Sequence, residues 1–167
     1  MSTIACGVDG SAQARHAAIV ARSLAERLGA RLILVYVRPT PPLIGAESVV
    51  AGARSVYQRS AELARLEAQE AFERLAPDIT PAHADCDLRL GQPAAELAAA
   101  AADCGAEFLV VGTRGRGTWR SAVLGSVSVA VTHLARCPVI VVPDRDDAEM
   151  HARPHGTAAE RERSSRS

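Results

Sequence analysis

Residues 3–37 read TIACGVDGSAQARHAAIVARSLAERLGARLILVYV, and this stretch decides the fold. It opens with an apolar run that stops at residues 9–11 (DGS), which predicts a short buried strand. Ser11 is a suitable N-cap, and after it apolar residues recur at helical spacing until Gly29, a residue suited to ending a helix. Residues 32–37 are apolar throughout, as in a strand covered on both faces. The stretch therefore predicts a βαβ unit with a right-handed crossover.

The rest of the chain continues this alternation of helix and strand. Residues 82–90 alternate apolar and polar side chains, which is typical of a half-exposed strand at a sheet edge. Together the patterns predict an α/β fold: an open, doubly wound, five-stranded parallel sheet in the order 3-2-1-4-5, with helices on both faces. The further elements that we expect are helices from about Ser55 to Leu75, from Pro93 to Gly105 and over 126–135, and strands over 108–111 and 138–142.

Residues 126–135 fit two structures. Valines at alternate positions favour a strand locally, whereas Val127, Ala130, Val131 and Leu134 repeat at helical spacing. We interpret this segment as a helix, with Ser126 as its N-cap.

Two segments carry no regular pattern. Residues 38–56 contain three prolines and are compatible with either a mobile flap or the start of a helix. Residues 144–167 are rich in charge, Ser, Gly and Pro and bury too little apolar surface to offset the entropy of ordering. We expect one domain over 1–143, followed by a disordered tail over 144–167.

Composition excludes several classes of function. The net charge is zero and aromatic residues make up 3% of the chain, so neither a nucleic-acid partner nor an anionic membrane is expected. All 19 basic residues are Arg, which rules out mechanisms that need a lysine. The chain has no transmembrane run and no signal-peptide pattern at its start, so we expect a cytoplasmic protein.

Cysteine and histidine show no metal-binding spacing. The four cysteines, at 6, 86, 104 and 137, lie far apart in apolar or alternating runs and are interpreted as small core residues. The five histidines are interpreted as residues of the surface or of helix faces. We therefore expect no metal site built from these side chains.

A glycine pattern, Gly112-x2-Gly115-x9-Gly125-Ser126, follows the apolar run 108–111. Glycines after a strand and before a helix allow backbone N–H groups to surround a phosphate, and the helix N-terminus adds positive potential. The alternative is a flexible loop with an ordinary serine cap. The Walker A motif is absent because there is no lysine, and the dinucleotide pattern fails because Arg120 occupies the place of its third glycine. Asp9, at the end of the first strand, would face this loop across the sheet, although an aspartate there is often only a turn former.

Three motifs together resemble the universal stress protein family. They are Gly-Val-Asp-Gly-Ser (7–11), the long glycine pattern, and Cys-Pro-Val-Ile-Val-Val-Pro (137–143). The resemblance covers roughly residues 2–143, and members that keep the glycine pattern bind ATP. It departs at Ala14, where many relatives have Ser in the first turn of the first helix.

The resemblance implies a set of nucleotide-binding residues. Gly112, Gly115, Gly125 and Ser126 would hold the triphosphate, with the backbone amides of Thr113, Arg114, Arg116, Gly117 and Val127 nearby. Asp9 would reach the ribose or a position associated with Mg²⁺. Val37 would contact adenine through its backbone, and Gly7 would allow close approach.

We expect an ATP-binding stress-response protein that acts as a sensor or switch, with no catalytic residues. One alternative is an enzyme that slowly hydrolyses ATP or transfers adenylate, although Val8-Asp9-Gly10-Ser11 is not the loop of the adenylating enzymes. Another is a protein-interaction module. The apolar strand 139–142 would be an exposed edge in a monomer, and family members often dimerise there, so we expect a homodimer through this strand. The downstream partner and the stress signal are not encoded in any recognisable motif.

Overall fold

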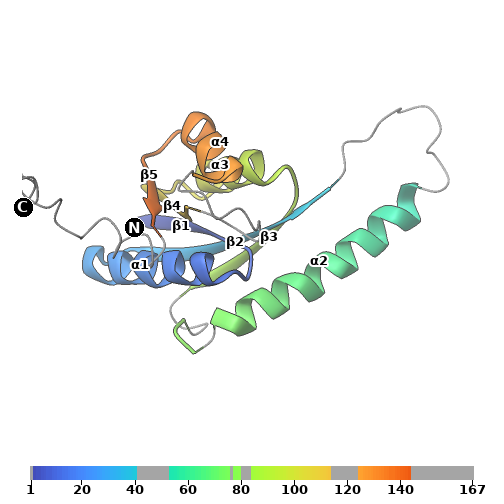
Figure 1. Cartoon of the computed structure of the whole chain (residues 1–167), viewed down its shortest axis with the longest axis horizontal. Helices are drawn as coiled ribbons and strands as arrows, with labels where there is room; N and C mark the ends of the chain where they lie inside the picture. Colours follow the sequence, from blue (N-terminus) through green and yellow to red (C-terminus); the bar gives the residue numbers. More distant parts are fainter. Residues whose placement is uncertain (1, 41–52, 76, 80–83, 114–123, 144–167) are drawn as a thin grey trace, which may run out of the picture.

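The computed structural model describes residues 2–40, 53–75, 77–79, 84–113 and 124–143. The described elements alternate between strand and helix along the chain (Figure 1). They are β1 (Thr3–Val8), α1 (Ala12–Leu28), β2 (Arg31–Pro39), α2 (Ala53–Leu75), β3 (Asp85–Gly91), α3 (Pro93–Asp103), β4 (Phe108–Gly112), α4 (Ser126–Leu134) and β5 (Val139–Val142).

The strands form one parallel sheet in the order β3-β2-β1-β4-β5. This confirms the order expected from the sequence, including the edge position of the alternating strand β3. Apolar side chains of β1 and β2 are buried on both faces because helices cover both sides of the sheet.

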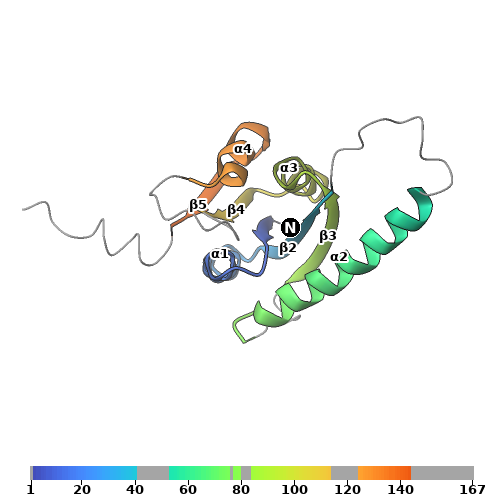
Figure 2. The same ribbon diagram turned by 45° about the vertical axis from the view of Figure 1, so that its right-hand side comes forward.

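Two separate cores lie on the two faces of the sheet (Figure 2). One face packs against α1 and α2, and its largest fully buried side chains include Ile4, Leu32 and Leu75. The other face packs against α3 and α4 through residues such as Leu97, Leu109 and Val131. Alternate residues of each strand supply the two cores, as the pleat of a strand requires.

The ends of α1 explain why the first βαβ unit forms where it does. Ser11 is the N-cap, and its Oγ accepts a hydrogen bond from the Ala14 N–H at 3.1 Å. Gly29 follows the helix with φ of 60°, the left-handed conformation that glycine adopts without a steric penalty. Both roles were predicted from the sequence and are confirmed.

Several sequence predictions need correction. The N-cap of α4 is Gly125 and not Ser126, which is the first helical residue. Two of the four apolar residues at helical spacing in α4, Val127 and Leu134, are exposed at 37% and 51%. Cys86 is exposed on β3, so it is not a core residue. For the exposed valine, leucine and cysteine the cause is the same: a neighbouring element decides which side of a helix or strand is covered. Residues 41–52, most of the segment without regular pattern, and the expected tail over 144–167 lie outside the described residues.

Candidate functional site

The carboxyl ends of β1 and β4 lie where the strand order of the sheet reverses. Pairing between β1 and β4 stops at Cys6 and Val110, whereas β1 continues to pair with β2 as far as Val8 and Tyr36. Ligands of doubly wound sheets bind at the place where the neighbouring strands separate. We call this place, with Asp9 after β1 and Thr113 after β4, the switch point.

Asp9 begins a tight turn between β1 and α1. Its Oδ1 accepts a hydrogen bond from the Ser11 N–H at 2.9 Å, and Gly10 has φ of 80°. This is the turn-forming role of an aspartate, and it holds the carboxylate at the strand end. This hydrogen bond fixes the Asp9 side chain at the switch point, so a structural role and a position beside a ligand are compatible.

Hydrogen bonds join the end of β4 to the start of α4. The Gly125 N–H donates to the Thr113 carbonyl at 2.7 Å, and the Thr113 N–H donates to the Val142 carbonyl at 2.9 Å. Ser128 Oγ lies 2.8 Å from the Gly112 carbonyl and 3.2 Å from that of Thr113. These contacts bring Gly112, Thr113 and Gly125 together, and Ser126 follows next in the chain. Arg114, Gly115, Arg116 and Gly117 lie outside the described residues.

Ser128 is a site residue that sequence reasoning missed. Its side chain is buried, with 4% exposure, on the third residue of α4. The local sequence does not show which side of α4 is covered, so it carried no signal for Ser128. The signal is tertiary, because the hydroxyl bonds to the backbone at the end of another element.

The first turn of α4 is suited to an anion. Its N-cap, Gly125, offers no side-chain hydrogen bond, and the turn contains no acidic residue. The backbone N–H groups there and the positive end of the helix dipole are therefore not neutralised by the helix's own side chains. Ser126 and Val127 are exposed in this turn.

A buried polar atom lies beside that turn. Thr113 Oγ1 is buried and has no hydrogen-bond partner within the described part of the chain. Because a buried hydroxyl without a partner is destabilising, such an atom at a strand end is consistent with a ligand group that completes its bonding.

Gly7 and Val37 occupy different places relative to the switch point. A Cβ added at Gly7 would lie 3.0 Å from Leu97 Cδ2 and 3.4 Å from Val111 Cγ1, so helix–sheet packing accounts for the glycine. Val37 is the first residue of β2 beyond the ladder with β1, and it pairs with Arg89 of β3. Val37 thus lies at the edge of the switch point, while Gly7 lies beneath α3.

A sequence profile described as the Universal stress protein family matches residues 1–143. The chain belongs to the universal stress protein family.

The match spans nearly the whole of one relative and less than half of another. A universal stress protein of Thermus aquaticus, named from the 3′ region of a QAH/OAS sulfhydrylase, is 36% identical over 142 residues, which cover 84% of this chain and 97% of the relative. A universal stress protein of Mycobacterium bovis is 35% identical over 136 residues, and the match covers 81% of this chain but 43% of that protein.

Solved structures share the fold of this universal stress protein. One from Burkholderia pseudomallei has 28% identity and a TM-score of 0.53, covering 86% of this chain and 96% of the other. A universal stress protein in complex with cAMP has 23% identity and a TM-score of 0.59, covering 84% of this chain and 96% of the other. At that identity the second likeness supports the fold alone.

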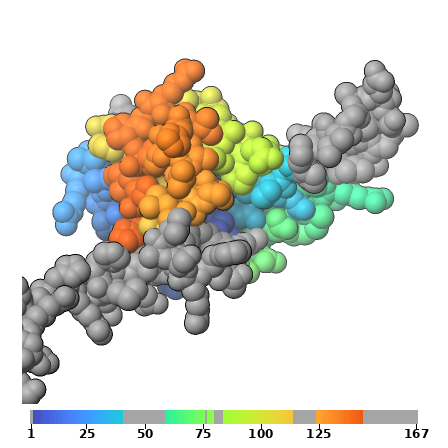
Figure 3. Space-filling view, turned by 45° about the horizontal axis from the view of Figure 1, so that its top comes forward, coloured from blue at the N-terminus to red at the C-terminus, as the bar shows by residue number. Residues whose placement is uncertain are grey.

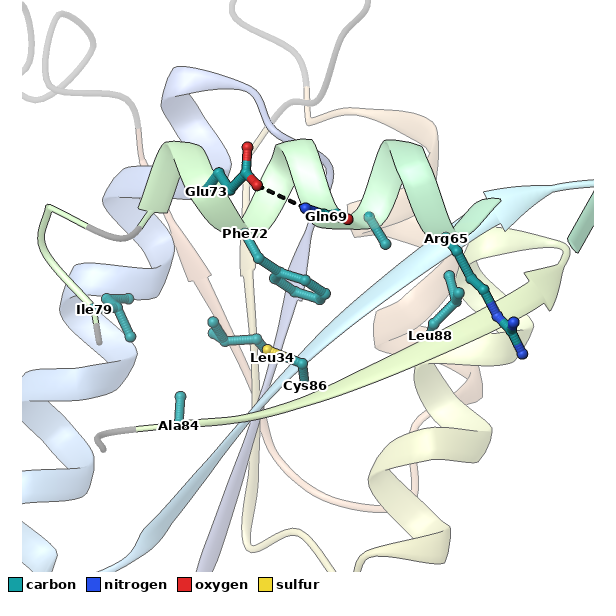
Figure 4. Close-up of a pocket in the computed structure, with 10 residues that line it drawn as sticks. Leu34, Arg65, Gln69, Phe72, Glu73, Ile79, Ala84, Cys86 and Leu88 are labelled. Carbon is teal, nitrogen blue, oxygen red and sulfur yellow. Dashed lines mark hydrogen bonds between the residues drawn. The ribbon is translucent and has the colours of Figure 1, made fainter. Parts of the chain in front are cut away.

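This universal stress protein also has an apolar groove of about 430 Å³ between α2 and strands β2 and β3 (Figure 4). In the close-up, Phe72 points from α2 toward Leu34, while Gln69 donates a hydrogen bond to Glu73 at 2.9 Å. The apolar lining does not suit phosphate, and none of the predicted nucleotide-binding residues belongs to it. The lining consists of Leu34, Arg65, Ala68, Gln69, Phe72, Glu73, Ile79, Ala84, Cys86 and Leu88.

Two structural features are absent from the described residues. Within those ranges, no three His, Cys, Asp or Glu side chains are grouped so as to hold a metal ion. Nor does any helix described here have the length and apolar character needed to span a membrane.

Proposed function

We propose that this universal stress protein binds ATP, with Mg²⁺, at the switch point and acts as a nucleotide-dependent sensor or switch in a stress response. The observation that carries the proposal is the first turn of α4, which lacks a side-chain cap and adjoins the buried, unpartnered Thr113 Oγ1. An anionic phosphate would supply acceptors to both. The glycine pattern, of which this turn is the end, supports a polyphosphate.

Each predicted residue has a role in this proposal. Gly112, Thr113, Gly125, Ser126 and Val127 would hold phosphate from the ends of β4 and α4. The same role is proposed for the loop residues Arg114, Gly115, Arg116 and Gly117. Asp9 would reach the ribose or a Mg²⁺-associated position, and the backbone of Val37 would contact adenine. Gly7 would act through the packing of α3 against β1 and not through direct contact.

Equilibrium titration with Mg·ATP is the first test. We expect saturable binding at submillimolar to millimolar nucleotide. One structural relative is described as a complex with cAMP, so cAMP and AMP serve as competing probes. Preference for ATP over both supports a polyphosphate cradle. Absence of detectable ATP binding at millimolar concentration would overturn the proposal. Tighter binding of cAMP than of ATP would show that ATP is not the preferred ligand.

Glycine substitutions locate the cradle. Gly125 has φ of −64° and ψ of 155°, a conformation open to any residue, so Gly125→Val tests space for a ligand and not backbone strain. We expect Gly115→Val and Gly125→Val to lose ATP binding while remaining folded. Ala102→Val, at an exposed position of α3, is the control and should bind normally. Retained affinity in both folded glycine variants would refute the assigned cradle.

A switch requires that ATP prefer one conformation of the protein, because a ligand shifts a population only by its differential affinity. Slow ATP hydrolysis or adenylate transfer is the competing function. Multiple-turnover product release well above background, lost in Asp9→Ala, would favour that enzyme activity over the switch.

We further propose a homodimer through β5, the edge strand that ends the sheet. Apolar side chains of α4, Val129 and Leu134, are exposed at 42% and 51% beside it. In Figure 3, α4 and β5 lie together on one face of the molecule. Light scattering after size exclusion should give about twice the 17.5 kDa chain mass at micromolar concentration. A mass of one chain would contradict the proposal.

A further inference from the structure

Cys104 and Cys137 lie at the same end of the sheet and on the same face. Cys104 is the C-cap of α3, which runs back from the carboxyl end of β3 to the amino end of β4. Cys137 comes two residues before β5, whose Val139 pairs with Leu109 near the start of β4. Both cysteines are half-buried and pack against the same core, the one covered by α3 and α4.

Burial raises the pKa of both thiols, and Cys104 acts in addition on that of Cys137. Burial is the main cause that raises the pKa of the Cys137 thiol, and the neighbouring Cys104 raises it further. Burial likewise raises the pKa of Cys104, opposed in part by hydrogen bonds from the backbone and by the positive charges of Arg31 and Arg89. Cys104 Sγ donates to the Ala101 carbonyl at 3.5 Å, and no disulfide joins it to another residue.

The remaining cysteines have other surroundings. Cys6 is fully buried in the core beneath α1, on the opposite face of the sheet. Cys86 is exposed on the edge strand β3 and lines the groove under α2. The chain thus has one pair of thiols in a shared environment and two single thiols that differ from the pair and from each other.

We propose that Cys104 and Cys137 form a reversible disulfide when the protein meets a peroxide. One thiolate attacks the O–O bond of H₂O₂, giving a sulfenic acid and hydroxide. The second thiol then attacks that sulfur, forms the S–S bond and releases water. In total, two thiols lose two electrons and two protons, and H₂O₂ is reduced to two waters. Because both pKa values are raised by burial, little thiolate is present at neutral pH, so the reaction is slow compared with that of a catalytic cysteine.

The bridge would close the segment that contains the nucleotide site. The chain between the two cysteines includes β4, Thr113, Gly125 and α4. The disulfide would join the two ends of that segment at the amino end of β4, opposite the switch point. A cross-link across a segment of this length restricts the unfolded chain and stabilises the native state.

Peptide mapping can identify the bridge directly, because each cysteine falls in a different tryptic peptide. The peptides are residues 1–15, 75–89, 90–114 and 137–145. After treatment of the full chain with H₂O₂ and alkylation of the remaining thiols, we expect peptides 90–114 and 137–145 to be linked. Dithiothreitol should separate them, and the oxidised protein should melt at a temperature roughly 5–10 °C above the reduced form.

Single substitutions give matched controls. Cys104→Ser and Cys137→Ser should each lose the linked peptide and the rise in melting temperature, and Cys104→Ala serves if the serine variant does not fold. Cys86→Ser should keep both. Two results would overturn the proposal. One is oxidation of Cys86 without any 90–114 to 137–145 link. The other is conversion of both cysteines to sulfinic acids with no link formed.

Discussion

Two serines two residues apart on α4 allow a sharp test of how the site is built. Ser128 Oγ is buried and lies 2.8 Å from the Gly112 carbonyl. Ser126 is exposed, and its hydroxyl makes no hydrogen bond with the described residues. The same substitution, Ser→Ala, therefore removes a structural bond at one position and only a proposed ligand contact at the other.

The expected magnitudes follow from these contacts. A buried hydrogen bond of this kind contributes about 1 kcal/mol net, and a carbonyl left unbonded costs about 1–3 kcal/mol. Alanine recovers roughly 0.5 kcal/mol through its higher helix propensity. We expect Ser128→Ala to lower the free energy of unfolding by about 1–2 kcal/mol. Ser126→Ala should change it by less than about 0.5 kcal/mol but lower ATP affinity roughly tenfold, since a bond to a charged group is lost.

Urea unfolding followed by circular dichroism measures the first effect, and calorimetric titration with Mg·ATP measures the second. Unchanged m-values are the control that both variants unfold as the parent does. The reasoning is refuted if Ser128→Ala is as stable as Ser126→Ala, because Ser128 would then not hold β4 to α4. Full ATP affinity in Ser126→Ala would remove that residue from the proposed cradle.

Two further predictions concern β1. Burial raises the pKa of Cys6 to about 12 from 9.0, so between these pH values the unfolded chain binds fewer protons than the folded one. Through Cys6, stability is unaffected below pH 9 and falls above it, by about 1.4 kcal/mol for each pH unit. Chemical denaturation under reducing conditions should show a steeper loss in the parent chain than in Cys6→Ala, in which only the other thiols with raised pKa contribute. At Gly7, an added Cβ would lie 3.0 Å from Leu97 Cδ2, so Gly7→Val should destabilise by about 1–3 kcal/mol through overpacking. The cost should be smaller when Leu97 is replaced by Ala, and strict additivity in this double-mutant cycle would show that Leu97 does not fill that space.

Much of the fold was predictable because its signals are local. The apolar runs of β1, β2 and β4 and the caps Ser11 and Gly29 depend on residues close together in the chain. The alternation in β3 marked an edge strand, and with it the strand order followed. From that order alone, Asp9 and Gly112 could be predicted to lie at the same edge of the sheet.

The faces that elements present to one another depended on the tertiary structure. In α4, helical spacing permitted several rotations about the helix axis. In the rotation observed, Val131 is buried and Val127 is exposed. The same rotation brings Ser128 into hydrogen-bonding contact with the end of β4. From the sequence, Gly7 was interpreted as a glycine that lets a ligand approach closely. In the structure it lies under Leu97 of α3, some 90 residues later in the chain.

The same distinction applies to the cysteines. Their spacing indicated isolated core residues, and for Cys6 burial confirms this. Cys104 and Cys137, however, pack against one core, because Cys104 ends α3 shortly before β4 and Cys137 precedes β5, which pairs with β4. Local hydrogen bonding and apolar periodicity are properties of short segments and can be read along the chain. Residues far apart in the chain come close together only when the sheet and helices pack. The shared environment of Cys104 and Cys137 and the role of Ser128 were therefore visible only in the tertiary structure.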